Sequence, residues 1–177
     1  VAHWADATLF WAAIPLALQT GGLALPGATP DMLKAFGADR AAMTPNLRRA
    51  TVPDAAAQLA SYFGWLESEF TDRRPFLLGA VPCVADVSAA QSVWHLRRAP
   101  LLATLFEPYP KVAAWYQRVT AFGHGTSTPL DSSEALEVAR RSTAFAPSTV
   151  APGLGFEAGA AVAVSATDYG TEPNEGT

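Results

Sequence analysis

The sequence predicts an all-α domain followed by a short β segment. Apolar residues recur at helical spacing in several segments, capping patterns precede those segments, and proline or glycine separates them. Near residue 145 the composition changes to proline, glycine, serine, threonine and alanine, which is typical of a linker. With 177 residues, 50% of them hydrophobic and 16% charged, the chain can bury a core. We therefore expect a helical bundle over 1–145, a linker over 146–158 and the start of a truncated β module over 159–177.

The first helix is predicted over about 1–19. Its apolar positions repeat every three or four residues, at Trp4, Ala7, Trp11, Ile14 and Leu18. Pro15 is expected to kink or end this helix, because proline removes a helical hydrogen bond. Thr29-Pro30-Asp31 offers an N-cap, a first-position proline and an acid in the first turn, so a second helix is predicted from there to about Thr44.

A main core helix is predicted from Thr51 to about Phe70. Its apolar face comprises Leu59, Tyr62, Phe63, Leu66 and Phe70. An apolar arm, Phe76-Leu77-Leu78-Gly79, leads to a fourth helix over 84–98. We expect that helix to turn its periodic apolar residues inward, namely Val84, Val87, Ala90 and Trp94.

Pro110 suits the first position of a further helix that runs to about Phe122. Its expected inward residues are Val112, Trp115, Tyr116, Val119 and Phe122. Asp131 to Glu134 fits a capping box, so a last helix should run to about Thr143. Residues 160–165 resemble a strand and Asp168-Tyr169-Gly170 a turn. A single strand is not stable alone, so we expect the rest of the β module outside this chain.

Charge and cysteine content exclude several classes of protein. The net charge of -4, without a long basic run, argues against nucleic acid and anionic membrane surfaces as partners. Cys83 is the single cysteine, which excludes an internal disulfide and fits a reducing, cytoplasmic location. The apolar run from Thr8 to Leu18 is shorter than the roughly 20 residues that span a bilayer. The chain begins at Val1 rather than methionine, which favours a piece of a longer protein.

Asp86 is the third residue of the helix predicted over 84–98, and Cys83 is its N-cap. A carboxylate at that position can accept hydrogen bonds from the N–H groups that open the helix, worth roughly 0.5–2 kcal/mol. A thiol is a weak acceptor, so Cys83 should cap less well than serine or threonine. Cys83 could instead be a reactive thiol, because a helix N-terminus stabilises a thiolate. Its apolar neighbours and the lack of a nearby base favour an inert, buried cysteine.

The sequence supplies no catalytic or metal-binding constellation. It contains no Gly-x-Ser-x-Gly elbow, phosphate-binding loop or dinucleotide fingerprint. His3, His95 and His124 are too scattered to predict a metal site. Val81-Pro82 is expected to be an ordinary loop with a trans bond. Several aromatic residues could either border an apolar pocket between helices or pack in the core: Trp4, Phe10, Trp11 and Tyr116.

Four stretches, in this order and spacing, resemble the all-helical C-terminal domain of bacterial glutathione S-transferase-like proteins. They are Phe76-Leu77-Leu78-Gly79, Val84-Ala85-Asp86-Val87, Pro108-Tyr109-Pro110 and Val112-Ala113-Ala114-Trp115. The family usually has serine or threonine where this chain has Cys83. In that family a separate N-terminal thioredoxin-like domain binds glutathione and carries the catalytic residue.

The resemblance implies a parent protein that conjugates or reduces small apolar electrophiles, with glutathione as co-substrate. It implies that this piece holds no cofactor or catalytic residue of its own. It would form one wall of the hydrophobic-substrate site and part of a homodimer surface, and it would contact the missing thioredoxin-like domain. By this likeness the pocket residues are Trp4, Thr8, Trp11 and Tyr116.

Two other functions remain open from the sequence. Transferase-like helical domains also serve as non-catalytic docking modules, and a fold does not fix a function. The β segment after the linker favours that alternative. The third function is that of a free-standing helical domain that binds an apolar ligand.

Overall fold

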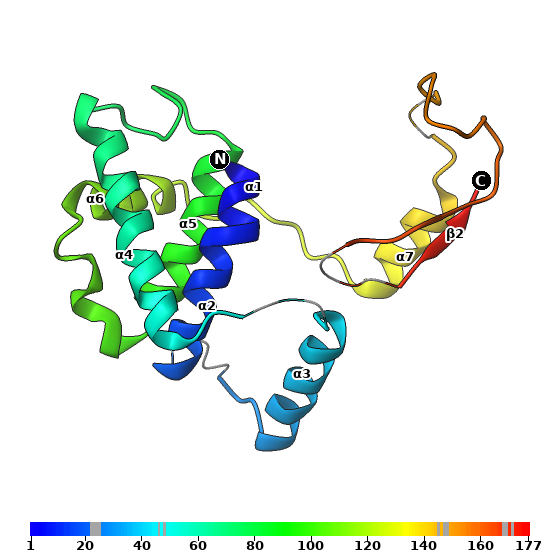
Figure 1. Cartoon of the computed structure of the whole chain (residues 1–177). Helices are drawn as coiled ribbons and strands as arrows, with labels where there is room; N and C mark the ends of the chain where they lie inside the picture. The colour runs from blue at the N-terminus through cyan, green and yellow to red at the C-terminus, as the bar shows by residue number, and fades with distance from the viewer. Residues whose placement is uncertain are drawn as a thin grey trace. The chain divides into compact units, whose positions relative to one another are not determined.

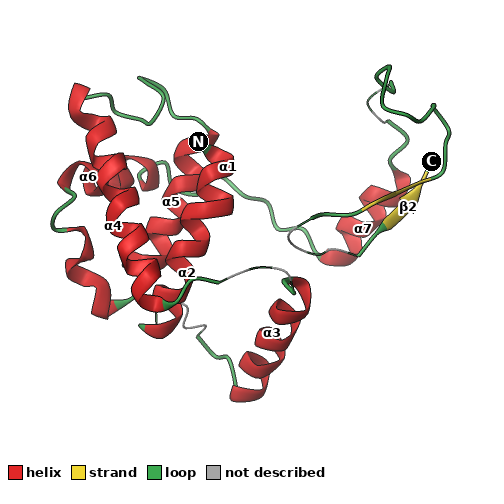
Figure 2. Cartoon of the chain, in the orientation of Figure 1, coloured by secondary structure: helices red, strands yellow, loops and turns green. Residues whose placement is uncertain are grey.

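The computed structural model describes residues 1–21, 26–45, 47, 49–144, 146, 149–167, 170 and 172–177. Figures 1 and 2 show a mostly helical chain with one short pair of strands near the C-terminus, so the predicted fold class is confirmed. The chain forms two compact units, residues 1–29 with 48–123 and residues 30–47 with 124–177. The predicted domain boundaries at 145 and 158 stay predictions. Within these described ranges, no helix is long and apolar enough to cross a membrane.

The first unit begins with one continuous helical run. It comprises α1 (Ala2–Trp4), a π-helical turn η1 (Ala5–Leu9) and α2 (Phe10–Gln19). The run packs against both α4 (Val52–Glu69) and α5 (Val84–Arg97). Pro15 lies inside α2 and does not end it.

The first helical run buries a different face from the one that the spacing of large residues predicts. The buried residues are mostly small: Ala5, Leu9, Ala12, Ala13, Leu16 and Ala17. Alanine side chains let neighbouring helix backbones approach closely, so they occupy the side that faces α4 and α5. Trp4, Trp11 and Ile14 are only half-buried, while Ala7 and Leu18 are exposed. The large apolar residues therefore form a second, outward stripe.

Helix α4 is the core helix that the sequence predicts. Thr51 is its N-cap and accepts a hydrogen bond from the Asp54 N–H, at 3.4 Å. Leu59, Phe63 and Leu66 are buried along one face. A short 3₁₀ turn, η2 (Phe70–Asp72), ends the helix, and the chain then reverses at Arg73 in the left-handed region, with φ of 66°.

Helix α5 begins at the predicted residue but turns different side chains inward. Val84 and Val87 are 70% and 63% exposed, and Trp94 is 43% exposed, so these expected core positions are wrong. The inward residues are Ala85, Asp86, Ala89, Ala90, Ser92, Val93 and Leu96. As in the first helix, alanine makes up much of the buried face, at Ala85, Ala89 and Ala90.

Residues 100–106 form a 3₁₀ turn, η3 (Pro100–Phe106), which leads to α6 (Pro110–Thr120). Val112 and Trp115 are fully buried, whereas Phe122 is 58% exposed, so its expected inward position is wrong. Tyr109 provides no side-chain cap for α6. Glu67 of α4 supplies one instead, because its carboxylate accepts hydrogen bonds from the Lys111 N–H at 3.0 Å and the Val112 N–H at 2.9 Å.

The second unit contains α3 (Pro30–Met43), α7 (Ser132–Arg141) and the strands. Asp131 caps α7 by accepting a hydrogen bond from the Glu134 N–H at 2.8 Å. The strand predicted at 160–165 is β1 (Val162–Val164), and it pairs antiparallel with β2 (Asn174–Gly176), which sequence reasoning did not identify. The predicted turn includes Asp168 and Tyr169, which lie outside the described residues, as do Pro147 and Ser148 of the expected linker.

Candidate functional site

Asp86 is the centre of the polar network in the core of the first unit. It is fully buried, and its Oδ1 accepts hydrogen bonds from the Leu77 N–H and from the indole N–H of Trp115, each at 2.8 Å. Its Oδ2 accepts from the Cys83 N–H at 3.0 Å and from the Cys83 thiol at 3.3 Å. One carboxylate thus joins the apolar arm, the start of α5 and the middle of α6.

Two opposing effects act on the pKa of Asp86. Burial alone raises the pKa, because it penalises the charged carboxylate. The hydrogen bonds from Leu77, Trp115 and Cys83 favour the charged form and bring the pKa below its ordinary value of 3.8. Asp86 is therefore ionised at neutral pH, and its oxygens are occupied by protein donors. This arrangement stabilises the fold and leaves the carboxylate no free position for a substrate.

Cys83 is half-buried at the N-cap of α5. Its thiol donates a hydrogen bond to Asp86, and its backbone carbonyl accepts one from the Asp86 N–H at 3.0 Å. Both hydrogen bonds lie in the first turn of α5 and join its N-cap to its third residue. The reactivity of the thiol stays a prediction. The adjacent Val81-Pro82 bond is trans, since no cis peptide bond occurs among the described residues.

The outward stripe of the first helical run carries most of the predicted pocket residues. Trp4 makes an edge-to-face contact with Tyr62 of α4, with ring centroids 5.4 Å apart. Thr8 is half-buried one turn further along the helix. Trp11 contacts Phe10 edge-to-face at 5.2 Å and borders a surface hollow.

The hollow beside α2 has a volume of about 440 Å³. Its walls come from α2 and from the segment that enters α4: Trp11, Ile14, Pro15, Leu18, Gln19, Arg49, Ala50 and Val52. The lining is mainly apolar, and Gln19 and Arg49 contribute the polar groups. Apolar pockets with few polar groups are typical of small-molecule binding sites. Among the described residues that line this hollow, none pairs a nucleophile with a base.

Tyr116 lies apart from that hollow, so the structure does not gather the four predicted residues around one cavity. It is half-buried on α6, and the Arg97 guanidinium lies 5.4 Å from the centre of its ring. Burial raises the pKa of the Tyr116 phenol, although Arg97 acts in the opposite direction. The phenol is therefore protonated at neutral pH.

Sequence reasoning missed Pro15, Ala50 and Val52 as pocket neighbours, and it treated Ile14 and Leu18 only as parts of a helix stripe. The signal was present in the sequence. Two apolar stripes run along residues 2–19, one of small residues and one of large residues, and a helix that packs closely on its neighbours buries the small one. The stripe of large residues then remains exposed and can contact a ligand.

Other chemistry is not assembled in the described part of the chain. No group of three or more histidine, cysteine, aspartate or glutamate residues there could hold a metal ion. His95 is half-buried, and burial together with the charge of Arg98 lowers its pKa. Its ring contacts are aromatic, to Phe10 at 5.8 Å and Trp94 at 4.9 Å.

Comparison with known proteins agrees with this architecture. Residues 49–118, which include Asp86 and its partners, match the family model described as "Glutathione S-transferase, C-terminal domain". Human glutathione S-transferases theta-2 and theta-2B are each 39% identical over 75 residues, which make up 42% of this chain and 28% of the relative. The chain therefore matches less than a third of the length of these curated relatives.

A solved structure matches nearly the whole chain. It is that of a glutathione S-transferase-like protein from Pseudomonas syringae, with a TM-score of 0.71 and 33% sequence identity. The match covers 99% of this chain and 54% of the Pseudomonas chain. Residues 49–118 thus match the glutathione S-transferase C-terminal domain family, and the mostly helical fold of the chain is consistent with such a domain.

Proposed function

We propose that this C-terminal-type domain forms the hydrophobic-substrate side of a glutathione S-transferase-like protein. The whole protein would conjugate or reduce small apolar electrophiles, with glutathione held by a separate thioredoxin-like domain. The catalytic residue would belong to the thioredoxin-like domain, because the described residues of this chain form no catalytic constellation. Detoxification in the cytoplasm and a homodimeric assembly belong to the same proposal.

The observation that carries the proposal is the outward apolar stripe on the first helical run. Trp11 and Ile14 are half-buried and Leu18 is 54% exposed, although the helix already buries a complete alanine-rich face. Partly exposed apolar side chains beside a hollow can contact an apolar ligand without any rearrangement of the core. Val52 extends this surface from α4.

The test uses the full-length protein that contains this chain, with chlorodinitrobenzene as the electrophile. We expect Trp11→Ala to raise the KM for the electrophile several-fold while the KM for glutathione stays unchanged. Trp94→Ala is the matched control, because Trp94 is a half-exposed tryptophan on α5 that does not line the hollow. If the two substitutions had equal effects, or if Trp11→Ala left the KM for the electrophile unchanged, the hollow would not be the binding site of the electrophile.

The alternative is a non-catalytic docking module, and one observation favours it. Helix α3 in the second unit exposes Met32, Leu33 and Phe36 by 60%, 48% and 50%. Exposed apolar side chains on one short helix are typical of a protein contact surface. Isothermal titration of the full-length protein with glutathione separates the two functions, since a docking module has no need to bind glutathione.

A further inference from the structure

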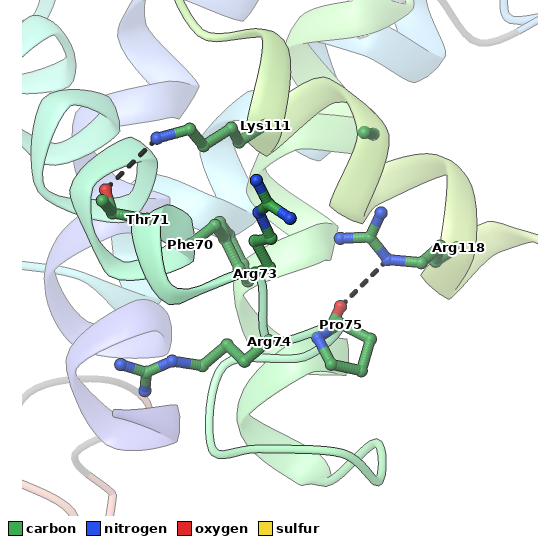
Figure 3. A pocket seen from close by; sticks show the side chains of 8 residues that line it. Phe70, Thr71, Arg73, Arg74, Pro75, Lys111 and Arg118 are labelled. Atoms are coloured by element: carbon green, nitrogen blue, oxygen red, sulfur yellow. Dashed lines mark hydrogen bonds between the residues drawn. The ribbon is translucent and has the colours of Figure 1, made fainter.

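A second hollow in the first unit is cationic, and it lies away from the apolar hollow beside α2. Its volume is about 390 Å³. The residues around it come from the end of α4, the following turn and the outer face of α6: Phe70, Thr71, Arg73, Arg74, Pro75, Lys111, Ala114 and Arg118. Figure 3 shows the side chains of this hollow.

Three of the four cations that line this second hollow form no ion pair among the described residues, although the Glu67 carboxylate binds the backbone N–H of Lys111. Arg74 is neutralised, because it forms ion pairs with Asp72 at 2.9 Å and with Glu69 at 3.4 Å. Arg73, Lys111 and Arg118 have no ion pair among the described residues. In Figure 3 the side chains of Arg73 and Arg118 extend toward each other, while Arg74 extends away. Cations held near one another without an anion repel, which costs stability.

Specific contacts hold two of these cations in place. The Nε of Arg118 donates to the Pro75 carbonyl at 3.0 Å, which leaves its terminal nitrogens for another acceptor. The Lys111 ammonium donates to the Thr71 hydroxyl at 3.2 Å and keeps two further protons for donation. Both groups are therefore oriented before any ligand arrives.

Arg73 stands where the backbone favours glycine. Its φ of 66° is in the left-handed region, and it is the only non-glycine residue with positive φ among those described. A residue with a side chain costs energy in that conformation, and such strain gathers at functional positions. Glycine would end the η2 turn at lower cost, but it would remove the guanidinium from the hollow.

We propose that this hollow binds the phosphoryl group of a small phosphorylated molecule. Arg73, Lys111 and Arg118 together suit an oxyanion of charge -2 or more, whereas a single carboxylate would balance only one of them. Guanidinium groups match phosphate oxygens in geometry. Phe70, Pro75 and Ala114 give the hollow apolar lining against which an organic portion of the ligand would pack. This site is independent of the proposed transferase function, since it shares no residue with the hollow beside α2.

The test is calorimetric titration of the whole chain with inorganic pyrophosphate, at constant ionic strength set with sodium chloride. We expect saturable binding with one site per chain. Lys111→Gln and Arg118→Gln should each weaken it by about tenfold, because each removes a charge-assisted hydrogen bond. Arg141→Gln is the matched control, since Arg141 is an exposed arginine of α7 in the other unit, and it should bind as the wild type does.

Arg73→Gly separates binding from folding. It removes a charge from the hollow and relieves the left-handed backbone, so the variant should unfold at an equal or higher temperature while its affinity for pyrophosphate falls. Absence of saturable binding to the wild-type chain would overturn the proposal. It would also be overturned if Arg73→Gly retained full affinity, or if Arg141→Gln lost as much affinity as Arg118→Gln.

Discussion

Removal of the Asp86 carboxylate should destabilise the first unit strongly. In Asp86→Ala, the Leu77 N–H and the Trp115 indole N–H lose their acceptor in a buried environment, and the Cys83 N–H loses its cap. A buried donor without a partner costs about 1–3 kcal/mol, and loss of a cap costs about 1 kcal/mol. The sum over the two donors and the cap is roughly 3–7 kcal/mol, which corresponds to a fall of at least about 6 °C in melting temperature for a chain of this size.

The assay is urea unfolding followed by far-ultraviolet circular dichroism, with tryptophan fluorescence as a second probe. Asp54→Ala is the matched control, because Asp54 is also the third residue of a capped helix but is exposed. The control should lose much less stability than Asp86→Ala. If the two variants unfolded at the same urea concentration, the network around Asp86 would contribute no more than an ordinary surface cap.

Further predictions concern the same network and the cap of α6. Because hydrogen bonds lower the pKa of Asp86, its contribution to stability should be complete above about pH 4 and should fall as the pH drops below that value. The difference in unfolding free energy between wild type and Asp86→Asn, measured by urea titration across this range, should shrink in acid; a constant difference would contradict the assignment. Cys83→Ser should raise the unfolding free energy by about 0.5–1 kcal/mol, because a hydroxyl caps better than a thiol, and an unchanged or lower value would argue against the cap. Glu67→Ala should lower it by about 1 kcal/mol by exposing the N–H groups of α6; amide exchange at Val112 would then accelerate, and unaltered exchange would refute the cap.

The helices were predictable because their signals are local. Thr51, Pro110 and Asp131 mark helix starts through capping and proline chemistry, and the structure begins α4, α6 and α7 at or just after them. These signals act within one helical turn, so no knowledge of tertiary contacts is needed.

The inward faces of two helices were not predictable from residue size. Val84 and Val87 lie outside, while Ala85 and Ala89 lie inside, because α5 packs closely against α2. Hydrophobic spacing finds an apolar stripe but does not say which of two stripes another helix will cover. The cationic hollow was likewise not predictable from the sequence, because Arg73 and Arg118 come together only after α4 and α6 are in place.

The bond from Glu67 to the backbone of Lys111 and Val112 has a consequence for the order of assembly. Helix α6 has a proline at its start and no side-chain cap of its own, and short helices are marginal in water. Its first turn becomes stable when α4 is already formed and adjacent, because the missing acceptor arrives from a residue more than forty positions earlier. Because α4 precedes α6 in the sequence, the Glu67 carboxylate is already part of the chain when the N–H groups that it caps are synthesised.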